Sequence, residues 1–298
     1  MAFKELARPS AGAGFYKGHG LGNDYLIFEE GNAWVLTPRA VERVCDFHRG
    51  PGSDGIVILL ADRSGGIFRL RMFNPDGSEF ERSGNGLRVL GSYLARCRYV
   101  DDRPFTVEVG GDRVTMTVHS TRGAVHDISA EMGKAQTGPA AVELDPGALD
   151  AQGRLPGPDG EPLDITPVRI GNPHVVVWRE APDDVELRRI GPFVATHPSI
   201  ARGTNVQLAK VVGPADCRIL IWERGVGRTS ASGTSSCAVA TAAVARGLVR
   251  PGQVAIHMDG GDLHVHVSRE LDIVLRGPVE EVYEGGLTDA FTAVLGKL

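Results

Sequence analysis

Short apolar runs separated by glycine and proline turns follow one another along the chain and predict many strands and few helices. In the first half the predicted strands are 15–28 (with a glycine turn inside), 56–60, 68–74, 105–109, 113–118 and 125–130. In the second half they are 168–170, 175–178, 206–211, 218–222, 254–258, 262–267 and 272–276. Helical spacing of apolar residues predicts helices over 38–48, from Ser83 through Leu94, and from Ser232.

A proline- and glycine-rich stretch without periodicity, residues 137–163, predicts a long connector near the middle of the chain. We therefore expect an N-terminal lobe over 1–130, to which 284–298 return, and a C-terminal lobe over 131–283. Residues 1–14 lack the apolar core of a secretory signal and are expected to form a loose extension.

The two halves of the chain carry related motifs. The triplet GND at 22–24 recurs as GNP at 171–173, and SGN at 83–85 recurs as SGT at 232–234. Each pair is 149 positions apart, which is half of the 298 residues. Repeats at one offset indicate duplication, so we expect two homologous α/β lobes facing each other across a cleft that holds one working site.

Each SG motif opens a predicted helix. Free backbone N–H groups and the helix dipole favour an anion at such a start, so two starts at one cleft predict a small carboxylate ligand such as an amino acid. Ser83 and Ser232 would then lie on opposite faces of its α-carbon. A serine here also serves as an N-cap, but a cap alone does not require the glycine that a ligand close to the backbone needs.

Other polar residues at strand ends are candidates for the same site. Glu223 and Arg224 follow a predicted strand and would supply a carboxylate for an amine and a guanidinium for a carboxylate. His174 would orient or protonate a substrate. Four asparagines lie in turns, where turn chemistry and ligand binding remain equally open: Asn23, Asn74, Asn172 and Asn205.

Composition narrows the function. With 42% hydrophobic and 23% charged residues the chain is typical of a globular protein, and its net charge of −5 without a basic cluster argues against nucleic acid as a partner. It lacks a run long enough for a membrane helix. Its four cysteines form no CxxC pair, so we expect no metal, reduced thiols and a cytoplasmic location. The GxGxxG match at 50–55 has the wrong flanking elements for a dinucleotide site.

Six stretches in family order, spanning nearly the whole chain, resemble diaminopimelate epimerase: HGLGNDYLIF, RGPGSDGIVIL, MFNPDGSEFERSGNG, GNPHVVV, GTNVQLAKV and WERGVGRTSASGTSSCA. The resemblance implies an α/β (α+β) fold of two pseudo-symmetric lobes, each a β-barrel-like sheet around a central helix. It implies an enzyme without pyridoxal phosphate, metal or other cofactor that interconverts LL- and meso-diaminopimelate for lysine and peptidoglycan synthesis. It also implies a homodimer, with the segment around Tyr283 at the interface.

The resemblance assigns roles to the candidate residues. Catalysis would involve Ser83, Ser232, His174 and Glu223. The reacting α-carboxylate would be held by Gly84, Asn85, Gly233 and Thr234. The amines and the distal carboxylate would be held by Asn23, Asn74, Asn172, Asn205, Glu223 and Arg224.

The sequence departs from the family at its acid–base pair, because two family cysteines fall at Ser83 and Ser232. A thiol is acidic, and more so at a helix start, whereas an alkyl hydroxyl is a far weaker acid. We therefore predict a severe loss of thiol chemistry, for which Cys237, one helical turn beyond Ser232, is a poor replacement. Gly55 and Arg228 stand where Gln and Glu are frequent, and either would alter substrate preference.

Three interpretations remain open. The chain is a diaminopimelate epimerase whose serines are natural or engineered; an isomerase or dehydratase of related fold that acts on another substrate; or a binding protein for a small amino acid.

Overall fold

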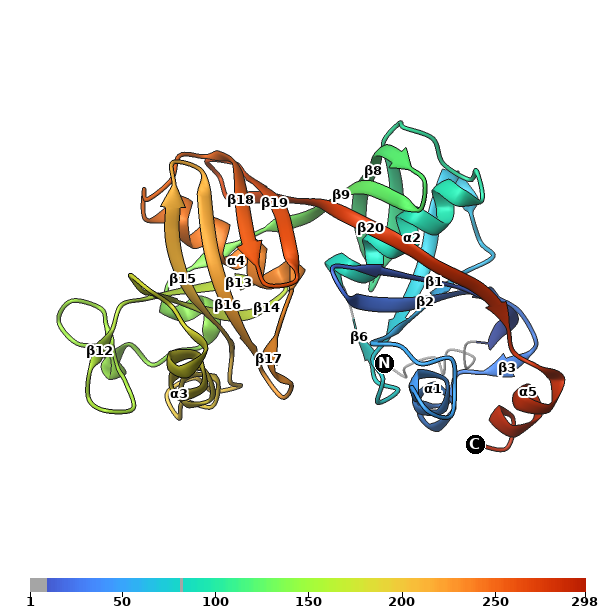
Figure 1. Ribbon diagram of the computed structural model, residues 1–298, viewed down its shortest axis with the longest axis horizontal. Coiled ribbons are helices and arrows are strands. Elements are labelled where there is room, and N and C mark those ends of the chain that lie inside the picture. The colour runs from blue at the N-terminus through green and yellow to red at the C-terminus, as the bar shows by residue number, and fades with distance from the viewer. Residues whose placement is uncertain (1–9, 81–82) are drawn as a thin grey trace, which may run out of the picture. The chain divides into compact units, whose positions relative to one another are not determined.

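The computed structural model describes residues 10–80 and 83–298 (Figure 1), and they divide into two compact units. Unit 1 contains Met1–Ala130 and Pro278–Leu298, and unit 2 contains Glu131–Gly277. The return to unit 1 thus begins earlier than the residue 284 expected from sequence. The reason is strand β20 (Asp272–Gly286), whose residues from Glu280 onward already pair with unit 1.

The strands of unit 1 form a closed ring in which each pairs with the next and β20 returns to β1. Two neighbouring pairs are parallel, β2 with β4 and β5 with β7, and the pairings in the rest of the ring that have a printed register are antiparallel. In ring order before β20 the strands are β1 (Ser10–Gly20), β2 (Asn23–Glu30), β4 (Ile56–Leu59), β5 (Ile67–Phe73), β7 (Phe105–Val109), β8 (Asp112–Arg122) and β9 (Val125–Lys134). Short strands β3 (Trp34–Val35) and β6 (Glu79–Phe80) pair with β1 and β5.

Helix α2 (Gly84–Arg96) packs against strands β1, β2, β4 and β8 of unit 1 (Figure 1). Its apolar side chains are fully buried at Leu87, Val89, Leu90 and Leu94. Helix α1 (Pro38–Cys45) connects β2 to β4 and begins at the N-cap Thr37, with proline at a first-turn position that tolerates it. Helix α5 (Asp289–Leu295) follows β20.

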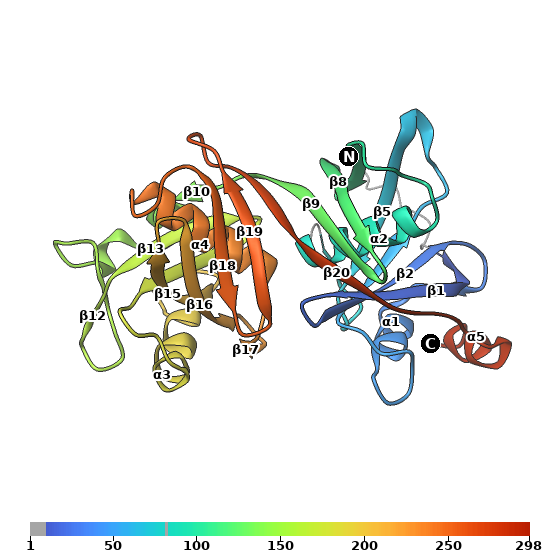
Figure 2. The ribbon, with the colours of Figure 1, turned by 45° about the horizontal axis from the view of Figure 1, so that its top comes forward.

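Unit 2 has a similar order of strands and helices (Figure 2). Its strands before β20 are β13 (Ile165–Ile170), β14 (Asn172–Trp178), β15 (Asn205–Gly213), β16 (Asp216–Glu223), β18 (Gly252–Met258) and β19 (Gly261–Val267). Again two pairs are parallel, β14 with β15 and β16 with β18. Short strands β10 (Gln136–Thr137) and β17 (Gly227–Thr229) pair with β13 and β16.

Helix α4 (Gly233–Ala245) packs against every strand of unit 2 from β13 through β19 except the short β17. Small apolar residues on all its sides suit a helix that is enclosed rather than surface-lying. Helix α3 (Asp184–Ala195) connects β14 to β15, as α1 connects β2 to β4. The predicted fold class, two pseudo-symmetric α+β units with a sheet around a central helix, is confirmed.

Three local features differ from the sequence prediction. Helix α3 was not predicted, because its Gly191-Pro192 pair is unfavourable inside a helix. The connector is not featureless: it carries 3₁₀ turns at Pro139–Val142 and Pro146–Ala148 and a hairpin of β11 (Leu155–Pro156) and β12 (Pro162–Leu163). Residues from Ser10 belong to β1 instead of a loose extension; the first nine lie outside the described residues.

Candidate active site

The helices α2 and α4 begin alike, each 13 residues long and each capped by a serine with extended backbone. The Ser83 hydroxyl accepts the Gly86 N–H at 3.1 Å, and the Ser232 hydroxyl accepts the Ser235 N–H at 3.4 Å. Helix geometry leaves the first N–H groups of each helix without an intrahelical partner. Each start therefore has a geometry that favours an anion.

A chain of hydrogen bonds fixes the side-chain amides around the start of α2 in unit 1. Arg88, fully buried in α2, donates to Asn85 Oδ1. Asn85 Nδ2 donates to Asn23 Oδ1 at 2.9 Å, and Asn23 Nδ2 donates to Asp54 Oδ2 at 2.9 Å. A guanidinium only donates and a carboxylate only accepts, so the two ends of the chain set the orientation of both amides. Among the described residues, each of the two amides has one further N–H that these bonds do not use.

Tyr25 on β2 contacts the candidate catalytic serine of unit 1. Its hydroxyl donates to Ser83 Oγ at 3.0 Å, and the residue is 6% exposed. Its ring lies in a slot between two glycines: a Cβ at Gly55 would be 2.5 Å from ring atom Cε1, and a Cβ at Gly86 would be 3.1 Å from it. The glycine at position 55, where Gln is frequent in the family that the chain resembles, thus leaves room for the Tyr25 ring.

In unit 2 a second chain of hydrogen bonds leads to Asn172. Gln207 Nε2 lies 2.9 Å from Ser235 Oγ and 3.0 Å from His174 Nδ1, and His174 Nε2 lies 2.8 Å from Asn172 Oδ1. With the Gln207 amide oriented as in the structure, its NH2 group donates, His174 Nδ1 accepts and His174 Nε2–H donates to Asn172 Oδ1. This orientation leaves Gln207 Oε1 buried without a partner among the described residues. These bonds do not use the NH2 group of the Asn172 side-chain amide, which can donate to a ligand.

His174 is completely buried, and burial lowers its pKa to about 3. The imidazole is therefore neutral at physiological pH, because desolvation disfavours its charged form. A neutral, buried ring does not favour the protonating role among the two expected from sequence. The contacts support the orienting role, since the ring holds the Asn172 amide in one orientation.

The remaining predicted residues have different surroundings. Asn205 Oδ1 accepts the backbone N–H of Arg224 at 2.9 Å and its Nδ2 donates to Pro173 O at 3.2 Å, which ties the start of β15 to the start of β14 and to the residue after β16. Arg224 Nη1 donates to Arg202 O. Glu223 is half-buried at the end of β16.

Asn74 and Arg228 have structural contacts. Asn74 Nδ2 donates to Ser78 Oγ at 2.9 Å and closes a turn, which favours the turn interpretation for this residue. Arg228, a departure from the family pattern, pairs with Asp184 at 2.9 Å and with Asp259.

Hydrogen bonds therefore group some of the predicted residues and leave others outside these groups. Asn23 and Asn85 are joined in unit 1, and Asn172 and His174 in unit 2. The sequence analysis missed four residues that complete these groups: Tyr25, Asp54, Arg88 and Gln207. Three of them had a signal, because Tyr25, Asp54 and Gln207 lie inside stretches already singled out, and Arg88 lies in the helix predicted from Ser83.

The cysteine thiols do not replace the missing acid–base pair. Burial raises the pKa of Cys45 to about 11 and that of Cys217 to about 12, so both are protonated at neutral pH. Burial also raises the pKa of Cys97. Cys237 is 0% exposed inside α4, which supports the expectation that it is a poor replacement.

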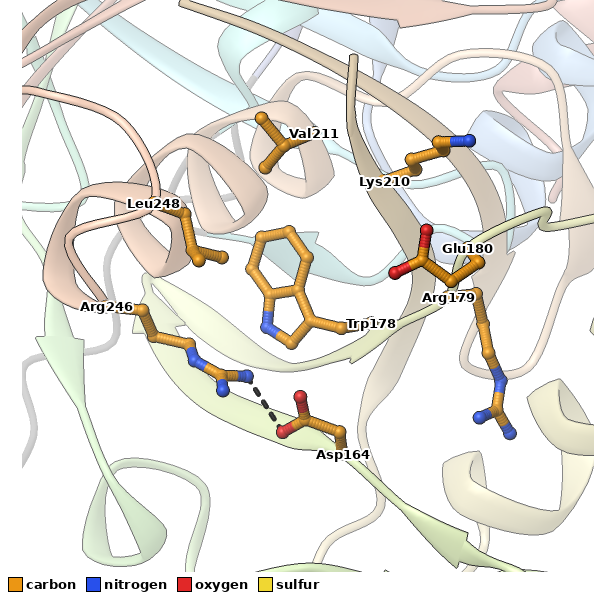
Figure 3. Close-up of a pocket in the computed structure, with 8 residues that line it drawn as sticks. All are labelled: Asp164, Trp178, Arg179, Glu180, Lys210, Val211, Arg246 and Leu248. Atoms are coloured by element: carbon orange, nitrogen blue, oxygen red, sulfur yellow. Dashed lines mark hydrogen bonds and ion pairs between the residues drawn. The ribbon is translucent and has the colours of Figure 1, made fainter. Parts of the chain in front are cut away.

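A cavity of about 380 Å³ lies elsewhere in unit 2 (Figure 3). The indole of Trp178 forms its centre, beside an Arg246–Asp164 ion pair of 2.8 Å. None of the predicted site residues lines it. Within residues 10–80 and 83–298, no cluster of three or more His, Cys, Asp or Glu side chains is placed to hold a metal, and no helix is long and apolar enough to cross a membrane.

Comparison with known proteins identifies relatives over most of the chain. The family model for diaminopimelate epimerase matches residues 15–138 and 166–282. The diaminopimelate epimerase of Pelotomaculum thermopropionicum is 34% identical over 281 residues, covering 91% of this chain and 97% of the relative. That of Desulforudis audaxviator is 36% identical over 285 residues, covering 91% and 98%.

Solved structures share the fold at low identity. A protein described as a predicted epimerase from Pseudomonas aeruginosa has a TM-score of 0.66 at 18% identity, covering 94% of this chain and 99% of its own. A probable proline racemase from Agrobacterium radiobacter has a TM-score of 0.65 at 16% identity, covering 95% and 98%.

Proposed function

Because the chain belongs to the diaminopimelate epimerase family, we propose that it binds LL- and meso-diaminopimelate and interconverts them by removing and returning the proton on the α-carbon. The observation that carries the proposal is the pair of matched helix starts at Ser83 and Ser232. Their free N–H groups suit the α-carboxylate, whose hydrogen bonds also stabilise the negative charge that develops when the α-proton leaves.

The surrounding side chains take the roles that the family suggests. Gly84, Asn85, Gly233 and Thr234 bind the reacting carboxylate. Asn23 and Asn172 present amide N–H groups to the ligand, held by Asp54 and His174 respectively. The guanidinium of Arg224 and the carboxylate of Glu223 bind the distal amino acid group. Asn74 and Asn205 shape the loops that carry these groups.

Incubation with LL-diaminopimelate in D₂O, followed by NMR of the α-position, tests the proposal. We expect slow deuterium incorporation by the natural chain. A Ser83→Cys/Ser232→Cys variant should react at least about 100-fold faster, because a positioned acid–base group of suitable pKa contributes roughly 10²–10⁴-fold. Cadaverine, which lacks both carboxylates, should not bind in calorimetry.

The two serines also favour a second candidate, a protein that binds a small amino acid without reacting with it. Tight binding of diaminopimelate with no exchange in the natural chain would support this alternative. No exchange and no binding in either protein would instead point to another substrate for a related isomerase or dehydratase.

We also propose a homodimer that uses the surface around Tyr283. This residue is 43% exposed on β20, and its ring packs edge-on against Phe15 at 5.9 Å. Light scattering of the purified protein should give twice the 31.7 kDa chain mass, and Tyr283→Asp should lower it toward that mass.

A further inference from the structure

Tyr25 occupies the position in unit 1 that His174 occupies in unit 2. The two residues are 149 positions apart, and each precedes a residue of a parallel strand pair, Leu26 with Ile56 and Val175 with Val206. His174 bonds to Asn172 and Gln207, whereas the Tyr25 hydroxyl bonds to the serine that caps α2. Equivalent positions therefore have different partners in the two units.

The residue opposite each position explains the difference. In unit 2 His174 faces Asn205 across the parallel pair. In unit 1 the corresponding residue is Gly55, whose carbonyl accepts the Leu26 N–H at 3.1 Å. Any side chain at 55 would overlap the Tyr25 ring, since its Cβ would be 2.5 Å from Cε1. Glycine at position 55 thus leaves the room that the Tyr25 ring needs to reach Ser83.

The hydrogen bonds of Ser83 decide what its hydroxyl can do. A hydroxyl has one donor and two acceptor positions. Tyr25 O–H and Gly86 N–H both donate to Ser83 Oγ, at 3.0 and 3.1 Å. These two bonds leave the hydrogen of Ser83 unused, and once Tyr25 is ionised its oxygen can only accept, so the Ser83 hydroxyl can donate to it.

We propose that Tyr25 and Ser83 form a proton relay that exchanges the α-hydrogen of an amino acid bound at the start of α2. This inference rests on the proposed function and supplies the proton-transfer group that the cysteine-to-serine change removes. Tyr25 acts through Ser83, which alone touches the substrate.

The relay balances without any further reactant. The ionised Tyr25 phenolate takes the hydroxyl proton of Ser83 while Ser83 takes the α-proton. The Cα–H bond breaks and its electron pair stays on the α-carbon, the Ser83 O–H bond is re-formed, and an O–H bond forms on Tyr25. The reverse sequence returns a proton, and exchange of the phenol proton with water introduces deuterium. The bond from Tyr25 to Ser83 in the structure corresponds to the protonated resting state.

The test compares Tyr25→Phe in two backgrounds, with α-deuterium incorporation from D₂O as the readout. In the natural chain we expect Tyr25→Phe to lower the exchange rate at least about 100-fold, with diaminopimelate affinity changed less than about threefold. In a Ser83→Cys background the same change should have little effect, because the thiol exchanges protons itself. Gly55→Ala, which displaces the ring, should reproduce the loss in the natural chain.

Tyr16→Phe is the matched control. It also removes a phenol hydroxyl bonded to a serine of α2, Ser92 at 2.8 Å, but away from the helix start. It should leave the exchange rate unchanged. The pH profile gives an independent readout: exchange by the natural chain should keep rising with pH as phenolate forms, whereas exchange by the Ser83→Cys variant should level off near the ordinary thiol pKa of about 8.5.

The exchange rates distinguish failure of the relay from failure of the proposed function. Equal exchange by the natural chain and Tyr25→Phe, or equal losses from Tyr25→Phe in both backgrounds, overturns the relay and leaves the proposed function intact. No exchange by the natural chain overturns both; exchange by the Ser83→Cys/Ser232→Cys variant then still identifies the substrate.

Discussion

The buried histidine of unit 2 should make the free energy of unfolding depend on pH, and the sign of this dependence follows from the pKa of its imidazole. His174 is 0% exposed with a pKa of about 3 in the folded protein, whereas an unfolded histidine has a pKa of about 6.5. Above pH 6.5 the imidazole is neutral in both states, and its contribution to stability is fully present. As the pH falls below 6.5 the unfolded state binds a proton that the folded state does not, and stability is lost.

The size of this loss at pH 5 follows from the unfolded pKa alone, because the folded pKa lies well below pH 5. The interval from 6.5 to 5 is about 1.5 units, each worth about 1.4 kcal/mol, so His174 should cost about 2 kcal/mol of unfolding free energy. Urea unfolding at pH 7.5 and pH 5, followed by tryptophan fluorescence, measures it.

The His174→Asn variant isolates this contribution. Its Oδ1 can still accept from Gln207 near the position of Nδ1, and it does not titrate. It should be less stable than the natural chain at pH 7.5 but should lose about 2 kcal/mol less on going to pH 5. His48→Asn, at an exposed position, should keep the natural pH dependence. An unchanged pH dependence in His174→Asn, or an imidazole that titrates above pH 5 by NMR, would refute the assignment of a buried neutral ring.

Two further predictions concern packing and ligand binding. Gly191→Ala places a Cβ 2.7 Å from the ring of Trp222 and should lower the unfolding free energy by about 1–3 kcal/mol in urea, whereas Gly14→Ala, with no atom within 4 Å of its Cβ, should change it little. Arg88→Met removes the donor that orients the amide at the start of α2 and should weaken diaminopimelate binding about tenfold in calorimetry, corresponding to about 1.4 kcal/mol. An affinity equal to that of the natural chain would show that the buried guanidinium does not orient the amide.

The duplication and both helix starts could be predicted from sequence because their signals are local. A serine cap, a glycine and an apolar helix lie within a few consecutive residues, and the same signal occurs twice at one offset. The strand positions could be predicted for the same reason, because a short apolar run and the glycines that bound it indicate where a strand begins and ends. Helix α3 could not be predicted, because the burial of Leu187, Ile190 and Val194 outweighs the unfavourable Gly191-Pro192 pair.

The hydrogen-bond partners of the site residues could not be predicted, because they depend on contacts between distant parts of the chain. Tyr25 and Ser83 are 58 positions apart and meet only when α2 is enclosed by the strands of unit 1. The slot at Gly55 is invisible in the sequence, where that glycine is one of 39. Likewise, a histidine in a turn-like motif gives no indication that its ring is completely buried, so its neutral state had to come from the structure.

Different residues orient the side-chain hydrogen-bond donors near the central helix start in the two units. In unit 1 a cation begins the hydrogen-bond chain and a carboxylate ends it, which leaves N–H groups of Asn23 and Asn85 unused. In unit 2 Gln207 donates to the neutral ring of His174, which in turn donates to Asn172 Oδ1. These bonds do not use the NH2 group of the Asn172 side-chain amide. Each unit therefore presents side-chain donors near the start of its central helix, an arrangement that suits a ligand with hydrogen-bond acceptors. On the proposed function, exchanging the serines for cysteines should therefore change proton transfer more than carboxylate binding, and the D₂O exchange rate and the calorimetric affinity measure the two separately.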